Sequence, residues 1–183
     1  MALTPSNMLP LGTPLPAFSL VDCSGKQHSS TDYKGKPLLV AFICNHCPYV
    51  KHLANHFSQF ARHYQQYGLQ VIAINSNDYR SHPEDSPEKM REEVKLRNYQ
   101  FPYLVDETQL VAQAFQAACT PDFYLFDASG KLAYRGQYDD SRPGNDIPPS
   151  GRDLRAACDA ILAGSPANTD QAPSVGCSIK WRT

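Results

Sequence analysis

The sequence predicts an α/β fold in which a central mixed β-sheet is flanked by helices. Residues 37–43 are a continuous apolar run, as expected of a strand that is buried on both faces of a sheet, and residues 69–75 indicate a second buried strand. Between them, residues 47–67 repeat apolar side chains at helical spacing, so strand, helix and strand form a right-handed crossover. Residues 123–126 and 131–136 flank a turn that contains Asp and Gly, which predicts an antiparallel hairpin.

The N-terminal part of the chain is rich in turns. Residues 17–20 and 26–28 flank a turn at residues 22–25, which indicates a small N-terminal hairpin before the first buried strand. After the second buried strand, Ser86 is followed by a proline and an acid. This pattern predicts the start of a helix that runs to about Asn98.

The remaining elements are predicted from polarity and capping residues. The segment 76–85 is polar, and we expect it to be a surface loop. Asp106 forms a capping-box pattern with a glutamine three residues later, which predicts a short helix that ends near Ala118. Ser150 precedes a last amphipathic segment, which predicts a helix over about residues 152–163.

Length and composition indicate one domain. We assign it to residues 1–164, followed by a C-terminal tail at residues 165–183 that packs on or near it. Hydrophobic residues make up 42% of the 183 residues, which is enough for an ordinary core. The net charge of -1 gives no reason to expect nucleic acid or an anionic membrane as partner. Neither a secretory signal nor an apolar run of about 18 residues is found, so we expect a cytoplasmic protein.

Six cysteines are too few to stabilise a chain of this length through disulfides, so a close pair is expected to be catalytic or metal-binding. Cys44 and Cys47 form a C-x-x-C motif at the predicted junction of strand and helix. Free backbone N–H groups and the helix dipole stabilise a thiolate at such a place. We expect Cys44 to be the exposed nucleophile and Cys47 to be the resolving thiol, which attacks the mixed disulfide and releases the product.

Residues beside the pair are expected to adjust its chemistry. His46 can place a positive or hydrogen-bonding ring beside the Cys44 thiolate, which would favour the reduced form. Pro121 follows Thr120 just before a predicted strand and is a candidate cis-proline. A cis bond would let the Thr120 backbone face the cysteines and pair with an extended substrate segment.

The apolar strand, the Cys44-Asn45-His46-Cys47-Pro48 motif, the crossover helix and the later Thr120-Pro121 together resemble the thioredoxin superfamily. The early Pro14-x-Pro16-x-Phe18 segment and the hairpin resemble its redoxin branch, which contains the alkyl hydroperoxide reductase/thiol-specific antioxidant group and thioredoxin-like thiol–disulfide proteins. The resemblance covers roughly residues 11–164. It implies the thioredoxin fold, a dithiol–disulfide activity of the cysteine pair, and substrate positioning by Thr120 and Pro121.

The sequence departs from both branches of this superfamily. Thioredoxins carry a buried Asp six residues before the first cysteine and a Trp directly before it, where this chain has Leu38 and Ile43. The buried acid that assists the resolving cysteine is therefore missing or supplied elsewhere. Peroxiredoxins carry Thr or Ser three residues before the reactive cysteine, and Cys44 occupies that place if Cys47 is the reactive thiol.

The leading hypothesis is a thiol–disulfide oxidoreductase that acts on protein or small-molecule thiols and disulfides. It needs no organic cofactor, since no Gly-rich phosphate-binding motif is present. The alternative is a redoxin-type thiol peroxidase, an antioxidant enzyme that consumes peroxide. A zinc-binding or redox-sensing module is a third alternative, although the chain lacks standard zinc-ligand spacing and no metal site is predicted.

Cys177 is a candidate third redox thiol. A glycine precedes it, and Ile179 and Trp181 follow it, which suggests a docked tail. Cys177 would then receive a disulfide from the C-x-x-C pair; the alternative is an unremarkable tail cysteine. Cys119 lies near the predicted site in sequence, but we expect it to be buried and unreactive.

Overall fold

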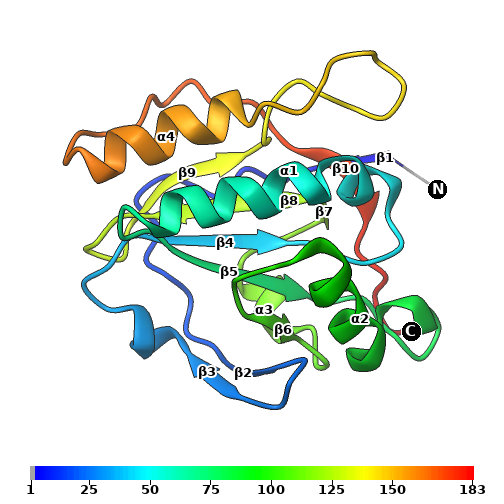
Figure 1. The fold of residues 1–183 in the computed structure, drawn as a ribbon. Helices are drawn as coiled ribbons and strands as arrows, with labels where there is room; N and C mark the ends of the chain where they lie inside the picture. Colours follow the sequence, from blue (N-terminus) through cyan, green and yellow to red (C-terminus); the bar gives the residue numbers. More distant parts are fainter. Residues whose placement is uncertain (1–2) are drawn as a thin grey trace.

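The computed structural model describes residues 3–183 and contains a seven-stranded mixed sheet (Figure 1). Its strands are β2 (Ser19–Asp22), β3 (Gln27–Ser29), β4 (Leu38–Phe42), β5 (Gln70–Asn75), β6 (Tyr103–Val105), β8 (Asp122–Phe126) and β9 (Leu132–Gly136). They lie in the order β3-β2-β6-β5-β4-β8-β9. The strands β4, β5 and β6 are parallel to one another, and the other neighbours are antiparallel. The predicted mixed sheet and N-terminal hairpin are therefore confirmed.

Strand β4 lies inside the sheet and leads to the C-x-x-C motif. All five of its residues are buried, as its continuous apolar run predicts. Helix α1 (Pro48–Gln65) follows, and β5 returns parallel to β4 with Leu38 opposite Gln70. The predicted crossover is confirmed, and it places the start of α1 at the edge of the sheet where β4 ends (Figure 1).

The other helices are η1 (Ser30–Tyr33), η2 (Pro83–Asp85), α2 (Pro87–Arg97), α3 (Leu110–Ala114) and α4 (Arg152–Leu162). Helices α1 and α4 cover one face of the sheet, and α3 covers the other (Figure 1). The core under α1 contains Phe57 and Phe60, whereas Phe42 and Phe115 pack edge to face in the core under α3. Among the described helices, none combines the length and apolar character needed to cross a membrane.

Helix α3 is shorter than its capping pattern predicts. It ends at Ala114 rather than near Ala118, and Gln116 beyond it has a left-handed φ of 52°, as is common at helix ends. The N-cap residue is Gln109, so the predicted capping box between Asp106 and Gln109 does not form. The Asp106 carboxylate instead accepts the backbone N–H of Val111 at 3.4 Å and that of the next residue at 2.9 Å. The predicted helix is therefore present, but its capping pattern and its length differ from the prediction.

The segment 76–85 is a surface loop only in its middle part, where Arg80, Ser81, Pro83 and Glu84 are exposed. Ser76 and Asn77 are buried at one end, and Asp85 is buried at the other. The single turn η2 brings the Asp85 carboxylate back toward the C-x-x-C motif. The prediction is therefore wrong only for the two ends of the segment, where the polar groups satisfy one another by hydrogen bonds and can be buried together.

A second, three-stranded sheet was not predicted. It consists of β1 (Leu3–Pro5), β10 (Val175–Ser178) and β7 (Cys119–Thr120), with β10 in the middle and antiparallel to both neighbours. The C-terminal tail thus contains a strand, β10, that crosses the end of β4 and α1 (Figure 1). No strand in this sheet exceeds four residues, which is too short for a clear alternating pattern. The division into residues 1–164 and 165–183 stays a prediction.

Candidate active site

Cys44 and Cys47 lie between β4 and α1, as predicted. Strand β4 ends at Phe42, and Cys47 is the N-cap residue of α1, with Pro48 in the first helical turn. The prediction that Cys44 is exposed is wrong, because Cys44 is only 2% exposed and Cys47 is 0% exposed. Contacts with Thr120 and with the tail strand β10 contribute to this burial.

Thr120 faces both cysteines. The peptide bond between Thr120 and Pro121 is cis, as predicted. The Thr120 Oγ1 lies 3.3 Å from the Sγ of Cys44, and the Thr120 carbonyl oxygen lies 3.3 Å from the Sγ of Cys47. The backbone of Thr120 is not open to a substrate here, since Cys177 of β10 is its partner in the second sheet.

Cys177 brings a third thiol into the site. Its Sγ lies 2.6 Å from the Sγ of Cys47, and its side chain is 3% exposed. Burial, followed by the hydrogen bond to Cys47, raises the pKa of Cys177 to about 12. The tail is therefore docked, as the residues around Cys177 suggested. Cys119 is fully buried, and burial raises the pKa of its thiol, as expected for an unreactive cysteine.

The thiolate is favoured at Cys47. Hydrogen bonding from the Cys44 thiol, joined by Cys177 and the backbone N–H of Val50, lowers the pKa of Cys47 to about 5 although burial opposes this. The hydrogen bond to Cys47 and burial raise the pKa of Cys44. The Thr120 carbonyl oxygen lies 3.3 Å from the Cys47 Sγ and accepts a hydrogen bond only from a protonated Cys47, so it opposes the lowering of the Cys47 pKa. The sequence analysis placed the thiolate on Cys44; α1 starts after Cys47, so Cys47 lies at the free N–H groups.

His46 is paired with a buried acid. Its Nδ1 lies 2.6 Å from the Oδ2 of Asp85, which is 1% exposed. The Asp85 carboxylate also accepts the backbone N–H of Asn45 at 2.7 Å and the side-chain amides of Asn75 at 3.2 Å and Asn77 at 2.8 Å. Burial works to raise the pKa of Asp85, but the hydrogen bonds from His46 and Asn77 lower it overall. The same hydrogen bond raises the pKa of His46, so the two groups form an ion pair.

Asp85 is the site residue that the sequence analysis missed. The chain has Leu38 where thioredoxins carry a buried acid, and the loop before α2 supplies another acid beside the pair. Cys44 Sγ, a ring nitrogen of His46 and a carboxylate oxygen of Asp85 lie within 4.8 Å of one another. These three groups are the only cluster within residues 3–183 with metal-ligating geometry. Because four N–H donors already bind the Asp85 oxygens, we interpret the cluster as a hydrogen-bonded network.

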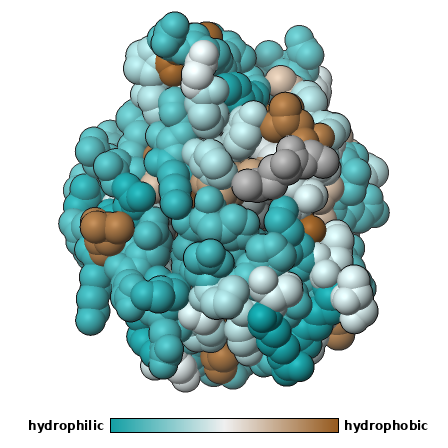
Figure 2. Space-filling model, turned by 90° about the vertical axis from the view of Figure 1, so that its right-hand side faces the viewer, coloured by the Kyte–Doolittle hydropathy of each residue, from teal (hydrophilic) through white to brown (hydrophobic). Residues whose placement is uncertain are grey.

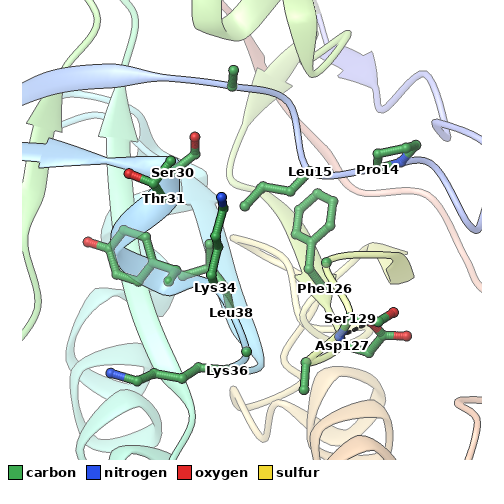
Figure 3. A pocket seen from close by; sticks show the side chains of 15 residues that line it. Pro14, Leu15, Ser30, Thr31, Lys34, Lys36, Leu38, Phe126, Asp127 and Ser129 are labelled. Carbon is green, nitrogen blue, oxygen red and sulfur yellow. Dashed lines mark hydrogen bonds between the residues drawn. The ribbon is translucent and has the colours of Figure 1, made fainter.

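One surface pocket lies away from the thiols. The pocket in Figure 3 has a cavity of about 260 Å³, and its lining includes Leu38 at the start of β4 and Phe126 at the end of β8. The C-x-x-C motif follows the opposite end of β4, so this pocket is not part of the thiol site. Figure 2 shows the face that carries the end of β4, and it is mostly hydrophilic with scattered hydrophobic side chains.

Comparisons with known proteins agree with this geometry. The AhpC/TSA family profile matches residues 11–135. Thiol-disulfide oxidoreductase ResA of Geobacillus thermodenitrificans is 27% identical over 129 residues, which cover 70% of each chain. The crystal structure of an uncharacterized conserved protein from Geobacillus kaustophilus is 50% identical, with a TM-score of 0.97 over 100% of this chain and 97% of that one.

The predicted thioredoxin fold is also confirmed by solved structures. A thiol:disulfide interchange protein of the thioredoxin family from Chlorobium tepidum is 22% identical, with a TM-score of 0.65. The match covers 82% of this chain and 97% of that one. At this level of identity, the likeness shows the fold.

The ion pair between His46 and Asp85 gives the first prediction. Asp85→Asn is expected to lower the pKa of His46, which corresponds to proton binding weakened roughly tenfold or more, because the buried negative partner is removed. NMR titration of the His46 ring measures this change. Glu84→Gln is the matched control, since it removes an exposed neighbouring acid. An unchanged His46 pKa in Asp85→Asn would show that the pair does not form in solution.

The pH dependence of stability has a defined sign. The folded-state pKa of His46 lies above its unfolded value of about 6.5, so the ion pair contributes fully below pH ~6.5. This contribution is lost as the pH rises through the folded-state pKa. Chemical denaturation should therefore show a larger destabilisation by Asp85→Asn at about pH 6 than at about pH 9. An equal or larger loss at the higher pH would contradict the assignment.

Proposed function

Because the chain belongs to the AhpC/TSA family, we propose that it is a thiol–disulfide oxidoreductase whose redox pair is Cys44 and Cys47. Its predicted place in the redoxin branch of the thioredoxin superfamily is confirmed by that family. The enzyme class agrees with the printed name of the ResA relative. The observation that carries the assignment of the pair is the position of Cys47 at the N-cap of α1, where free backbone N–H groups favour a thiolate.

In the proposed reaction, the Cys47 thiolate attacks one sulfur of a substrate disulfide. A mixed disulfide with Cys47 forms, and the other substrate sulfur leaves as a thiolate. Cys44 then attacks the Cys47 sulfur, which releases the second substrate thiol and leaves a Cys44–Cys47 disulfide. The electron pair has passed from the two cysteines to the substrate. This order reverses the roles expected from the sequence, because the favoured thiolate is Cys47.

In the second step, Cys44 attacks as a thiolate and its proton leaves with the departing substrate sulfur; the charged pair of His46 and Asp85 lies close enough to Cys44 to influence this ionisation. The negative charge of Asp85 and the hydrogen bond to Cys47 both keep Cys44 protonated at rest. Once Cys47 is bound in a mixed disulfide, its negative charge is gone, so ionisation of Cys44 becomes easier. His46 retains its proposed role as the residue that tunes these thiols.

Thr120 and Pro121 are proposed to position the substrate. The Thr120 carbonyl oxygen lies beside the Cys47 sulfur, so an extended substrate paired with this backbone would present a disulfide to the thiolate. Protein or small-molecule thiols and disulfides are the proposed partners, in line with the relative's printed name. The cytoplasm remains the proposed location.

A thiol peroxidase is the second candidate function, and the pKa of Cys47 favours it. The Cys47 thiolate would attack a peroxide oxygen, releasing water or an alcohol and forming a sulfenic acid. A neighbouring thiol would condense with the sulfenic acid to a disulfide and release water. Stopped-flow measurement of peroxide consumption decides this alternative. A wild-type rate no faster than that of a free thiol would exclude it, whereas a rate roughly 100-fold above Cys47→Ser would support it.

The oxidoreductase proposal predicts which cysteine is indispensable. Cys47→Ser should reduce insulin no faster than the uncatalysed background, because no thiolate remains to attack. Cys44→Ala should retain the first attack, but more slowly near neutral pH, since Cys47 loses a hydrogen-bond donor that serine would still supply. Cys158→Ala is the matched control, because this buried cysteine lies in α4. Insulin reduction by Cys47→Ser at the wild-type rate would refute the proposal.

A further inference from the structure

The tail strand β10 occupies the place where a substrate strand would bind. In β10, Cys177 pairs with Thr120 and Ser178 pairs with Cys119, in antiparallel register. Addition of an extended strand to an exposed sheet edge is a common way of binding a peptide. Here the added strand, β10, belongs to the chain itself. It carries Cys177 opposite Thr120, the residue that faces Cys44 and Cys47.

The close approach of β10 depends on Gly176. A Cβ atom at this position would lie 2.0 Å from the Thr120 carbonyl oxygen and 3.2 Å from the Pro121 Cδ. Glycine therefore lets the two backbones meet without a side chain between them. The next residue, Cys177, extends to the Cys47 sulfur, and the two Sγ atoms lie 2.6 Å apart.

Hydrogen bonds on both sides of Cys177 hold β10 in this position. Before it, Ser174 donates its backbone N–H to Ser6 Oγ at 2.9 Å and its hydroxyl to the carbonyl oxygen of Gly136 at 2.6 Å. After it, the backbone N–H of Ile179 binds the carbonyl oxygen of Ala118 at 3.0 Å. A thiol fixed in this way has a high effective concentration at its target, as in an intramolecular reaction.

The position of Cys177 also explains why the thiols are buried. Cys47 is 0% exposed, and β10 is the element that brings Cys177 against it. A disulfide substrate can reach the Cys47 sulfur only if β10 moves aside from Thr120. Movement of β10 away from β7 separates few residue pairs, because β7 has only two residues. Return of β10 would displace a bound substrate strand from the same edge.

We propose that Cys177 is a second resolving thiol, which competes with Cys44 for the mixed disulfide on Cys47. This inference rests on the proposed function. The Cys177 thiol attacks the Cys47 sulfur of the mixed disulfide, a Cys47–Cys177 disulfide forms, and the substrate sulfur leaves with the proton of Cys177. The bond to the substrate breaks as β10 returns to Thr120, so chemistry and product release coincide. The resulting disulfide ties β10 across the site.

The two internal disulfides are alternatives, because Cys47 takes part in both. In the Cys47–Cys177 form, attack of Cys44 on the Cys47 sulfur gives Cys44–Cys47 and frees the Cys177 thiol, with no net oxidation. The chain therefore has one oxidised state that holds β10 in place and another that leaves it free to move. A reducing partner acts on the form with the free tail, because the Cys47 sulfur is then reachable.

The test uses the full chain with Ellman's disulfide reagent, which releases a coloured thiolate at each exchange. Cys44→Ser should release about two equivalents and form a Cys47–Cys177 disulfide that peptide mass spectrometry detects. Cys44→Ser/Cys177→Ser should stop at about one equivalent and retain the mixed disulfide. Cys44→Ser/Cys158→Ala is the matched control and should behave like Cys44→Ser. A persistent mixed disulfide on Cys47 in Cys44→Ser would overturn the proposal.

Two further measurements separate this inference from the proposed function. If Cys47→Ser exchanges as fast as the wild type, the proposed function fails; if Cys47 is required but never pairs with Cys177, only this inference fails.

In the unmodified chain, acid quenching during oxidation should reveal some Cys47–Cys177 disulfide, which avoids reliance on the fold of a variant. Gly176→Ala should reduce its yield several-fold, whereas Ser178→Ala should not. Equal yields in all three proteins would contradict the role of β10.

Discussion

A buried thiolate at Cys47 is the interaction on which the rest of the site depends. Charge in a protein interior is costly unless donors surround it. The Cys44 thiol, the Cys177 thiol and the first turn of α1 supply these donors from three parts of the chain. The crossover fixes Cys44 and the start of α1, and the small second sheet fixes Cys177. The thiolate of Cys47 is therefore stabilised only when the crossover and the second sheet have both folded.

The ion pair of His46 and Asp85 complements this arrangement. The negative charge of Asp85 raises the pKa of Cys44 and so discourages a second thiolate beside the first. A protonated Cys44 can then serve as a hydrogen-bond donor to Cys47. His46 balances the charge of Asp85, and asparagine amides satisfy the remaining acceptor positions. The two networks meet at Cys44, which links the acid to the thiolate.

The sequence predicted those features that depend on local pattern. The apolar run of β4, the periodicity of α1 and the Cys-x-x-Cys spacing each follow from a few adjacent residues, and all lie where expected. Asp85 and the pairing of Cys177 depend on contacts between distant segments. A polar loop such as 76–85 looks exposed until its hydrogen-bond partners are known. The thiolate was expected on Cys44 because the free N–H groups at the junction of strand and helix were assigned to the first cysteine, whereas Cys47 is the N-cap residue of α1.

The most direct test of the central claim is the ultraviolet absorbance of thiolates during a pH titration of the reduced protein. The wild type should show a thiolate step with a midpoint near pH 5, the pKa to which Cys47 is lowered. Cys47→Ser should lose that step, and Cys44→Ala should retain it at a higher pH, because one donor is gone. A low-pH step that survives in Cys47→Ser and disappears in Cys44→Ala would place the thiolate on Cys44 and contradict the account.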